Sequence, residues 1–165
     1  MNCPNCGAPM RLDEGADHWS CEFCLSLYAP APDQDGLCVL DAAMENCPLC
    51  QGGLNHAVLV GVRLLSCPHC RGMLIPMADF MTTAERLRAT LPGSSVPLAP
   101  PPARELQRRI DCPRCRQPMD NHLYGGAGSI IIDSCENCAV IWLDAGELRR
   151  VASAPDYQYR PSLES

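Results

Sequence analysis

Twelve of the thirteen cysteines in this chain fall into six C-x-x-C pairs, and the pairs are arranged two by two along the sequence. The two pairs of a set are separated by 14, 16 and 19 residues in the first, second and third set. This spacing is typical of structural zinc sites in which four thiolates bind one ion. The sequence therefore predicts three zinc ions, with these ligands: Cys3, Cys6, Cys21 and Cys24; Cys47, Cys50, Cys67 and Cys70; Cys112, Cys115, Cys135 and Cys138.

Metal is expected because each set serves a short module of a 165-residue chain. Modules below about 40 residues rarely bury enough apolar surface to fold unaided. Two Phe, four Tyr and two Trp offer no large aromatic core. Structural zinc supplies the deficit, since its binding contributes roughly 10–16 kcal/mol at neutral pH.

An iron–sulfur centre and disulfides are the competing uses of the cysteines. Disulfides require an oxidising compartment. The chain begins Met1-Asn2-Cys3-Pro4, without the basic and apolar segments of a signal peptide, and it has no apolar run of membrane-spanning length. We therefore expect a cytoplasmic protein whose paired cysteines bind zinc.

The formal net charge is −6, and all thirteen basic residues are arginine. With its abundant alanine and proline, this composition suggests a GC-rich bacterial genome. Deprotonating the cysteines to bind zinc makes the balance more acidic, which opposes uniform binding to a phosphate backbone. A nucleic-acid contact would need a local basic patch, and one cluster could form it: Arg104, Arg108, Arg109, Arg114 and Arg116.

We predict a small zinc-stabilised β (α+β) fold of three tandem four-cysteine zinc ribbons. Each ribbon is expected to be a β-hairpin plus a third strand, with short helices after ribbons 2 and 3. The expected divisions are zinc ribbon 1 at 1–30, a connector at 31–46, zinc ribbon 2 with its helix at 47–90, a proline-rich linker with a short helix at 91–111, zinc ribbon 3 with its helix at 112–154, and a flexible tail at 155–165.

The hairpins follow from apolar, β-branched runs on either side of turn residues. The expected positions are 56–60 and 62–66 around Gly61, 123–124 and 129–133 around the glycines of 125–128, and a turn near 13–17 in ribbon 1. The apolar stretch 37–40 is predicted to be a strand that packs on ribbon 1 or ribbon 2.

Helices are expected at roughly 77–90 and 144–153, with a shorter one at 104–110. Asp144 and Glu147 have the spacing of a capping box at a helix start. Leu148 and Val151 would then face the hairpin of ribbon 3.

The segment from Cys135 to Leu148 reads C-E-N-C-A-V-I-W-L-D-A-G-E-L. Together with the C-P-x-C pair that begins at Cys112, it resembles the transcription-factor-IIB-type zinc ribbon of many bacterial proteins. The resemblance is close over 112–152, looser over 47–85 and only generic over 1–30. It implies zinc binding and a role in transcription. The family often has glycine after the last cysteine, where this chain has Ala139.

Three features have alternative interpretations. The run 67–70 copies the active site of a thioredoxin-class thiol oxidase, but the surrounding sequence lacks a βαβ pattern and pairs it with a second C-x-x-C. Trp142, Asp144 and Glu147 are interpreted as a hydrophobic anchor with a helix cap rather than a binding cluster. The unpaired Cys38 is interpreted as a small core residue, with a regulatory thiol as the alternative.

Four cysteines close each site, whereas a catalytic zinc keeps one coordination position open. We therefore expect no enzyme, but a zinc-binding multi-ribbon protein that acts as a protein-interaction scaffold or adaptor with a link to transcription. Its partner is expected to be a protein, with no membrane contact, and the expected contact sites are the sheet edges and the surface around Met73, Leu74 and Trp142. The alternatives are a nucleic-acid-binding transcription regulator that uses the arginines of 104–116 and, more remotely, a thiol redox or zinc-storage protein.

Overall fold

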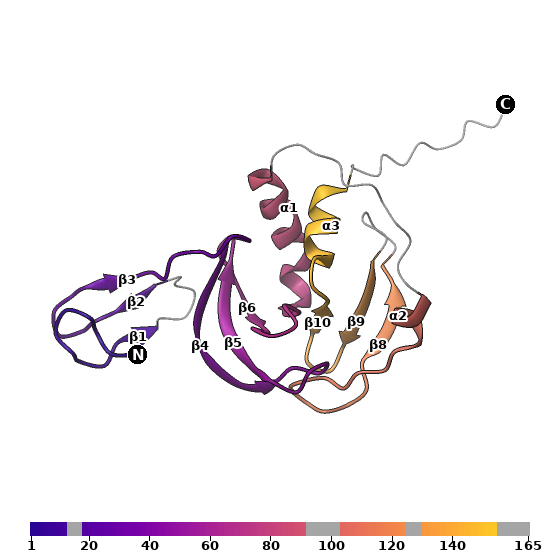
Figure 1. Ribbon diagram of the computed structural model, residues 1–165, viewed down its shortest axis with the longest axis horizontal. Coiled ribbons are helices and arrows are strands. Elements are labelled where there is room, and N and C mark those ends of the chain that lie inside the picture. The colour runs from indigo at the N-terminus through magenta and orange to yellow at the C-terminus, as the bar shows by residue number, and fades with distance from the viewer. Residues whose placement is uncertain (13–17, 92–102, 125–129, 155–165) are drawn as a thin grey trace.

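The structure is a computed structural model that describes residues 1–12, 18–91, 103–124 and 130–154 (Figure 1). Its strands form a three-stranded and a seven-stranded antiparallel sheet, with strand orders β1-β2-β3 and β4-β5-β6-β7-β10-β9-β8. The strands are β1 (Arg11–Leu12), β2 (Trp19–Ser20), β3 (Leu27–Tyr28), β4 (Leu37–Asn46), β5 (Gly53–Leu59), β6 (Val62–Ser66), β7 (Met73–Pro76), β8 (Asp120–Leu123), β9 (Ile131–Cys135) and β10 (Val140–Leu143). The helices are the 3-10 turn η1 (Met77–Asp79) and the α-helices α1 (Phe80–Thr90), α2 (Ala103–Gln107) and α3 (Glu147–Ser153). The predicted fold of three tandem zinc ribbons with few short helices is confirmed.

Ribbon 1 contains the three-stranded sheet and projects from the rest of the molecule (Figure 1). Its core is small: among the described residues, Met10 and Trp19 are buried with Cys3 and Cys21, and Ala8, Cys24 and Leu40 pack against them while partly buried. The predicted turn at 13–17 lies outside the described residues.

The predicted hairpin of ribbon 2 is confirmed. Strands β5 and β6 pair from Leu59 opposite Val62, so the turn consists of Val60 and Gly61. Both turn residues have positive φ, 45° and 80°, which matches the twist of the flanking strands. In ribbon 3, β8 and β9 form the expected hairpin, but the strands are Asp120–Leu123 and Ile131–Cys135 rather than the predicted 123–124 and 129–133. The glycines of 125–128 lie outside the described part of the chain.

The strand predicted at 37–40 is longer than expected. It extends through β4 to Asn46 and pairs with β5 of ribbon 2, with Leu37 opposite Leu59. Leu40 of the same strand packs against the core of ribbon 1. Residues 37–46 of the segment 31–46, expected to be a connector, therefore form the edge strand of the large sheet and contact both ribbons.

Ribbons 2 and 3 are joined by an antiparallel pairing of their third strands. In this pairing of β7 and β10, Leu74 lies opposite Trp142 and Ile75 lies opposite Ile141. Leu74 and Trp142 are 2% and 0% exposed. The prediction that these two residues form an exposed contact site is therefore wrong, because the sheet that unites the ribbons buries them; Met73 beside them is half-buried.

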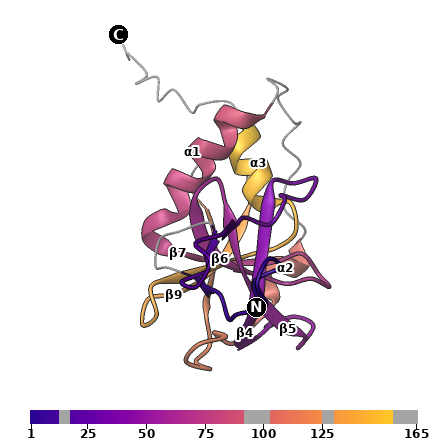
Figure 2. The same ribbon diagram turned by 90° about the vertical axis from the view of Figure 1, so that its left-hand side faces the viewer.

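Helices α1 and α3 lie side by side on the concave face of the large sheet (Figures 1 and 2). Phe80 and Leu87 of α1 and Leu148 and Val151 of α3 share one buried cluster with the sheet. The Arg88 guanidinium of α1 donates hydrogen bonds to the carbonyl oxygens of residues 151 and 152 at the end of α3, at 3.3 and 2.9 Å. The helices predicted at 77–90 and 144–153 thus close the core, although the first begins with the turn η1 and the second begins only at Glu147.

The predicted capping box forms only in part. The backbone N–H of Asp144 donates to the Glu147 carboxylate at 2.7 Å, as a capping box requires. The Asp144 carboxylate does not cap the helix, because it accepts hydrogen bonds from Trp142 Nε1 at 3.1 Å and from Arg108 at 2.6 Å. The helix begins instead after Gly146, whose φ of 85° is readily adopted only by glycine.

Gly72 permits the close contact between ribbons 2 and 3. A Cβ atom at this residue would lie 2.3 Å from Cζ2 of the fully buried Trp142. We predict that Gly72→Ala lowers the free energy of unfolding of the zinc-loaded protein by about 2 kcal/mol, because the added methyl group would overlap an indole that is fully buried in the core. Denaturant unfolding followed by tryptophan fluorescence measures this change.

Gly53→Ala is the matched control, since nothing lies within 4 Å of the added Cβ atom and the residue lies in a strand. We expect this variant to unfold like the wild type. Equal stability of the two variants would contradict the proposed contact.

Candidate metal centres

The structure brings the twelve paired cysteines together in three groups of four. Within each group, the Sγ atoms lie within 4.8 Å of one another. The groups contain the same cysteines as the three sets in the sequence: Cys3, Cys6, Cys21 and Cys24; Cys47, Cys50, Cys67 and Cys70; Cys112, Cys115, Cys135 and Cys138. No histidine, aspartate or glutamate among the described residues forms another group of this kind.

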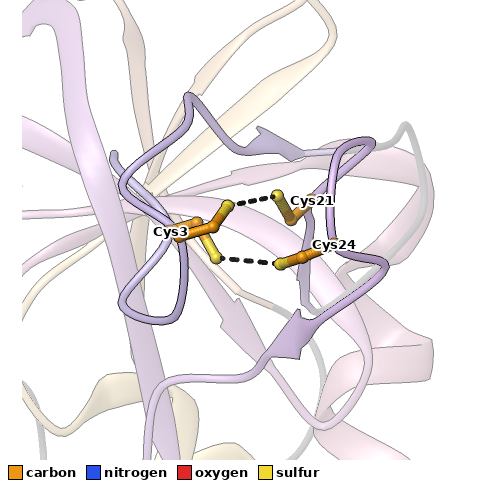
Figure 3. Close-up of side chains that lie close together, drawn as sticks. Cys3, Cys21 and Cys24 are labelled. Carbon is orange, nitrogen blue, oxygen red and sulfur yellow. Dashed lines mark hydrogen bonds between the residues drawn. The ribbon is translucent and has the colours of Figure 1, made fainter.

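The sulfur geometry fits a tetrahedral zinc ion. In ribbon 1 the sulfur atoms point toward one another from the two C-x-x-C turns (Figure 3), with Cys3 and Cys24 3.5 Å apart. The closest pairs in ribbons 2 and 3 are separated by 3.4 and 3.6 Å. Four thiolates at about 2.3 Å from a zinc ion would be about 3.8 Å apart, so a small expansion admits the ion. All thirteen cysteines lie in the described part of the chain and are free of disulfides.

Each C-x-x-C pair forms the same tight turn, called a knuckle below. The residue after its second cysteine has positive φ in all six knuckles: 76° at Gly7, 59° at Leu25, 60° at Gln51, 62° at Arg71, 60° at Arg116 and 51° at Ala139. In five knuckles the N–H of this residue donates to the carbonyl oxygen of the first cysteine at 2.8 to 3.0 Å. Ala139 thus adopts the geometry for which the family often uses glycine, and the metal site offsets the cost of the strained backbone.

Backbone N–H groups also point at the sulfur atoms. Leu49 and Cys50 donate to Sγ of Cys47 at 3.4 and 3.5 Å, and Cys70 donates to Sγ of Cys67 at 3.4 Å. Such donors stabilise thiolates in a site that water does not solvate well.

Without a cation, the pKa values of the thiols in one group are shifted in opposite directions. Burial raises the pKa of Cys47, and burial followed by the neighbouring thiols Cys115 and Cys112 raises the pKa of Cys135. In ribbon 1, hydrogen bonds from the side chain and backbone of Ser26 lower the pKa of Cys24 to about 5. A divalent cation removes the repulsion among four thiolates, so the donor set fits zinc chemically as well as geometrically.

The second and third centres are structurally linked. Cys47 and Cys67 of ribbon 2 share one buried cluster with Cys112 and Cys135 of ribbon 3, and Trp142 lies in the same cluster. The cysteines of ribbon 1 belong to a separate small cluster. The metal centres of ribbons 2 and 3 therefore stabilise one common core, whereas the centre of ribbon 1 stabilises its own.

Arg108 belongs to a buried network rather than to an exposed basic patch. Its guanidinium donates to Asp133 at 2.7 Å and to Asp144 at 2.6 Å, and Asp133 is fully buried. Asn121 donates a further hydrogen bond to Asp133 at 2.9 Å. The network ties the residue after α2 to the sheet of ribbon 3. Sequence reasoning missed it because its members are far apart in the chain and match no local motif.

The other arginines of the predicted cluster that the structure describes are exposed, unlike Arg108. Arg109, Arg114 and Arg116 are exposed around the first knuckle of ribbon 3. Arg114 lies 3.7 Å from the carboxylate of Glu45. The side chain of Arg104 lies outside the described part of the structure.

Glu147 lies next to this network and is 5% exposed. Its burial raises its pKa to about 7, although the hydrogen bond from the Asp144 backbone N–H opposes the rise. Trp142, Asp144 and Glu147 thus form an internal structural unit, in agreement with their interpretation as a hydrophobic anchor with a helix cap rather than a binding cluster. Cys38 is half-buried on β4, opposite Val58, and takes part in none of the three metal groups.

Residues 111–154 match the model of a protein family described as "Transcription factor zinc-finger". The match covers ribbon 3 and helix α3, and it confirms the resemblance noted over 112–152. Comparisons with curated proteins and with solved structures find no significant match. The fold and the three four-cysteine groups define a zinc-binding protein of tandem zinc ribbons, and its third ribbon is similar to that of transcription factor IIB. No helix in the described ranges is long and apolar enough to span a membrane.

Loss of one zinc ligand should act differently in ribbon 1 and ribbon 3. We predict that Cys21→Ser leaves two tightly held zinc ions, because ribbon 1 has its own core. Cys112→Ser should weaken the centre of ribbon 3, which loses a ligand. It should in addition speed zinc release from the intact centre of ribbon 2 at least about ten-fold, because the two centres share a buried cluster. Native mass spectrometry counts the ions, and a chromogenic chelator follows their release. Unchanged release from ribbon 2 in Cys112→Ser would contradict the shared core.

Arg108 should be far more important for stability than its exposed neighbours. We predict that Arg108→Gln lowers the free energy of unfolding by about 3 kcal/mol, because the buried Asp133 carboxylate loses its cation. Arg114→Gln, the matched control, should cost less than about 0.5 kcal/mol. Denaturant unfolding of both zinc-loaded variants measures the difference, and equal costs would show that the network contributes little.

Proposed function

We propose that this protein is a non-enzymatic adaptor that binds another protein through its zinc-ribbon platform. The observation that carries the proposal is the closed shell of four thiolates in each of the three groups, which leaves no coordination position for a substrate or a reactive water. The zinc ions then serve to hold surfaces in place. A link to transcription is supported by the family match of ribbon 3.

The surface that best suits a protein partner is a groove of about 840 Å³ on the concave side of the large sheet. Its lining includes the apolar side chains of Leu37, Val39, Leu59, Met73 and Leu148. This groove replaces the surface around Leu74 and Trp142, which is buried. An open apolar groove with polar edges is the usual form of a site for a peptide segment or side chains of a partner.

Charged residues define one edge of the groove. Asp35 forms ion pairs with both Arg71, after the second knuckle of ribbon 2, and Arg149 of α3, the latter at 3.0 Å. All three side chains are partly exposed. Exposed ion pairs contribute little stability, so a partner with its own charged groups can exchange them at small cost.

Nucleic-acid binding is the second candidate function. It is favoured by Arg109 and Arg116, which line a polar cleft between the first knuckles of ribbons 2 and 3. The acidic net charge and the internal use of Arg108 weaken it. Fluorescence anisotropy with labelled single- and double-stranded DNA and RNA at about 50 and 200 mM salt separates the two functions, since phosphate contacts weaken steeply with salt.

The adaptor proposal is tested with a variant that blocks the groove. Val39 is 40% exposed and lines the groove, so Val39→Glu should place a charge there without unfolding the sheet. Met44→Glu, on the same strand but fully exposed and outside the groove, is the control. We expect affinity capture from the source cells to recover a partner with wild type and Met44→Glu, and at least about ten-fold less of it with Val39→Glu.

All three proteins must retain three zinc ions by native mass spectrometry. Capture that is equal for Val39→Glu and the wild type would exclude the groove as the site. Salt-sensitive binding of nucleic acid in the micromolar range or tighter would favour the second candidate function instead.

A further inference from the structure

Ribbons 2 and 3 are joined through the edges of their third strands, and the equivalent edge in ribbon 1, on β3, is unpaired among the described residues. Among the described residues, β3 is hydrogen-bonded on one side only, because the small sheet has the order β1-β2-β3. The third strands of the other two ribbons, β7 and β10, are paired on both sides. Leu27 and Tyr28 of β3 are 68% and 39% exposed, whereas Leu74 and Trp142 are buried.

The pairing of β7 with β10 has the register of a two-fold axis. Leu74 and Trp142, which lie opposite each other, are each the fourth residue after the last cysteine of their ribbon. On either side of them, the third residue of one ribbon lies opposite the fifth residue of the other, as Ile141 does with Ile75. Two ribbons therefore meet in equivalent positions, as identical subunits do about a two-fold axis.

The residue of ribbon 1 that is equivalent to Leu74 and Trp142 is Tyr28, the fourth residue after Cys24. Leu27 and Ala29 take the third and fifth positions, and all three residues are exposed. Pro30 follows in the position that Pro76 holds at the end of β7, so its missing N–H is compatible with the pairing. We propose that β3 pairs antiparallel with β3 of a second copy of this chain, with Tyr28 opposite Tyr28 on a two-fold axis.

The second knuckle of ribbon 1 supports an interface at this edge. Phe23 and Leu25 are 74% and 82% exposed. The equivalent residues are His69 and Arg71 in ribbon 2, and Asn137 and Ala139 in ribbon 3. Leu25 has the positive φ, 59°, that this position has in every knuckle, and no described residue covers its apolar side chain.

This knuckle borders the strand edge directly. In ribbon 2, Gly72, the second residue after the last cysteine, touches Trp142 of the neighbouring ribbon. Ser26 holds that position in ribbon 1, next to Leu25. Val140 holds it in ribbon 3, so a residue larger than glycine is compatible with the pairing. Pairing of two β3 strands would cover an apolar surface that ribbon 1 alone leaves in water.

The charge of ribbon 1 sets the salt dependence of this dimer. Residues 1–30 contain four acidic residues and one arginine, and zinc bound by four thiolates adds further negative charge. Two copies of ribbon 1 therefore repel each other at low salt. We expect the dimer to form more tightly at 300 mM than at 20 mM salt, opposite to the behaviour of a phosphate contact.

Sedimentation equilibrium of the zinc-loaded full-length protein tests the proposal over about 5 to 500 μM. The mass should rise with concentration from 17.9 kDa toward twice that value. Tyr28→Asp and Tyr28→Arg should each weaken the dimer at least about ten-fold, because like charges would meet on the two-fold axis. An equimolar mixture of the two variants should dimerise again, since the opposed charges then attract.

The mixture also controls for folding, because two unfolded variants would not restore a dimer, and native mass spectrometry should show three zinc ions in each. Leu123→Asp on the edge strand β8 and Met44→Asp on the edge strand β4 are the matched controls, and both should dimerise like wild type. The proposal is overturned by a wild type of constant mass, by loss of the dimer in a control, or by variants of Tyr28 that do not complement. The test uses purified protein alone, so its result is independent of the proposed adaptor function.

Discussion

The binding of four thiolates to each zinc ion is the constraint on which this architecture rests. Each ribbon is too short to bury a core large enough to fold without metal, and each knuckle holds one residue at positive φ, in five cases a residue other than glycine. Both costs are tolerable because the metal fixes the two knuckles of a ribbon against each other. The hairpins, the third strands and the helices that follow them all start from these fixed points.

The second level of organisation is the pairing of β7 with β10, which converts two metal-stabilised modules into one seven-stranded sheet. This pairing buries Leu74 and Trp142 between the metal centres and provides the concave face on which α1 and α3 pack. Arg108 then attaches the residues after α2 to this unit through two buried or half-buried carboxylates. Ribbon 1 has the same local plan but no equivalent neighbour for its third strand.

Local features of the fold could be predicted from the sequence, and long-range ones could not. C-x-x-C spacing predicts the cysteine groups, and the residues around Gly61 predict a hairpin, because ligand geometry and turn geometry act over a few residues. The burial of Leu74 and Trp142 depends on two strands that are distant in the chain, so the sequence suggested an exposed surface instead. The carboxylate of Asp144 likewise does not cap the helix as predicted, because it accepts hydrogen bonds from Arg108 and from the Trp142 indole.

The union of ribbons 2 and 3 has a consequence for synthesis on the ribosome. Strand β7 is complete at Pro76, but its partner β10 begins only at Val140. Translation proceeds at about 5 to 20 residues per second, so the apolar edge of β7 stays unpaired for roughly 3 to 13 seconds before β10 is synthesised. Neighbouring nascent chains on one messenger carry the same edge at high local concentration. Exchange of third strands between such chains is a form of misassembly that this open edge favours until β10 is made.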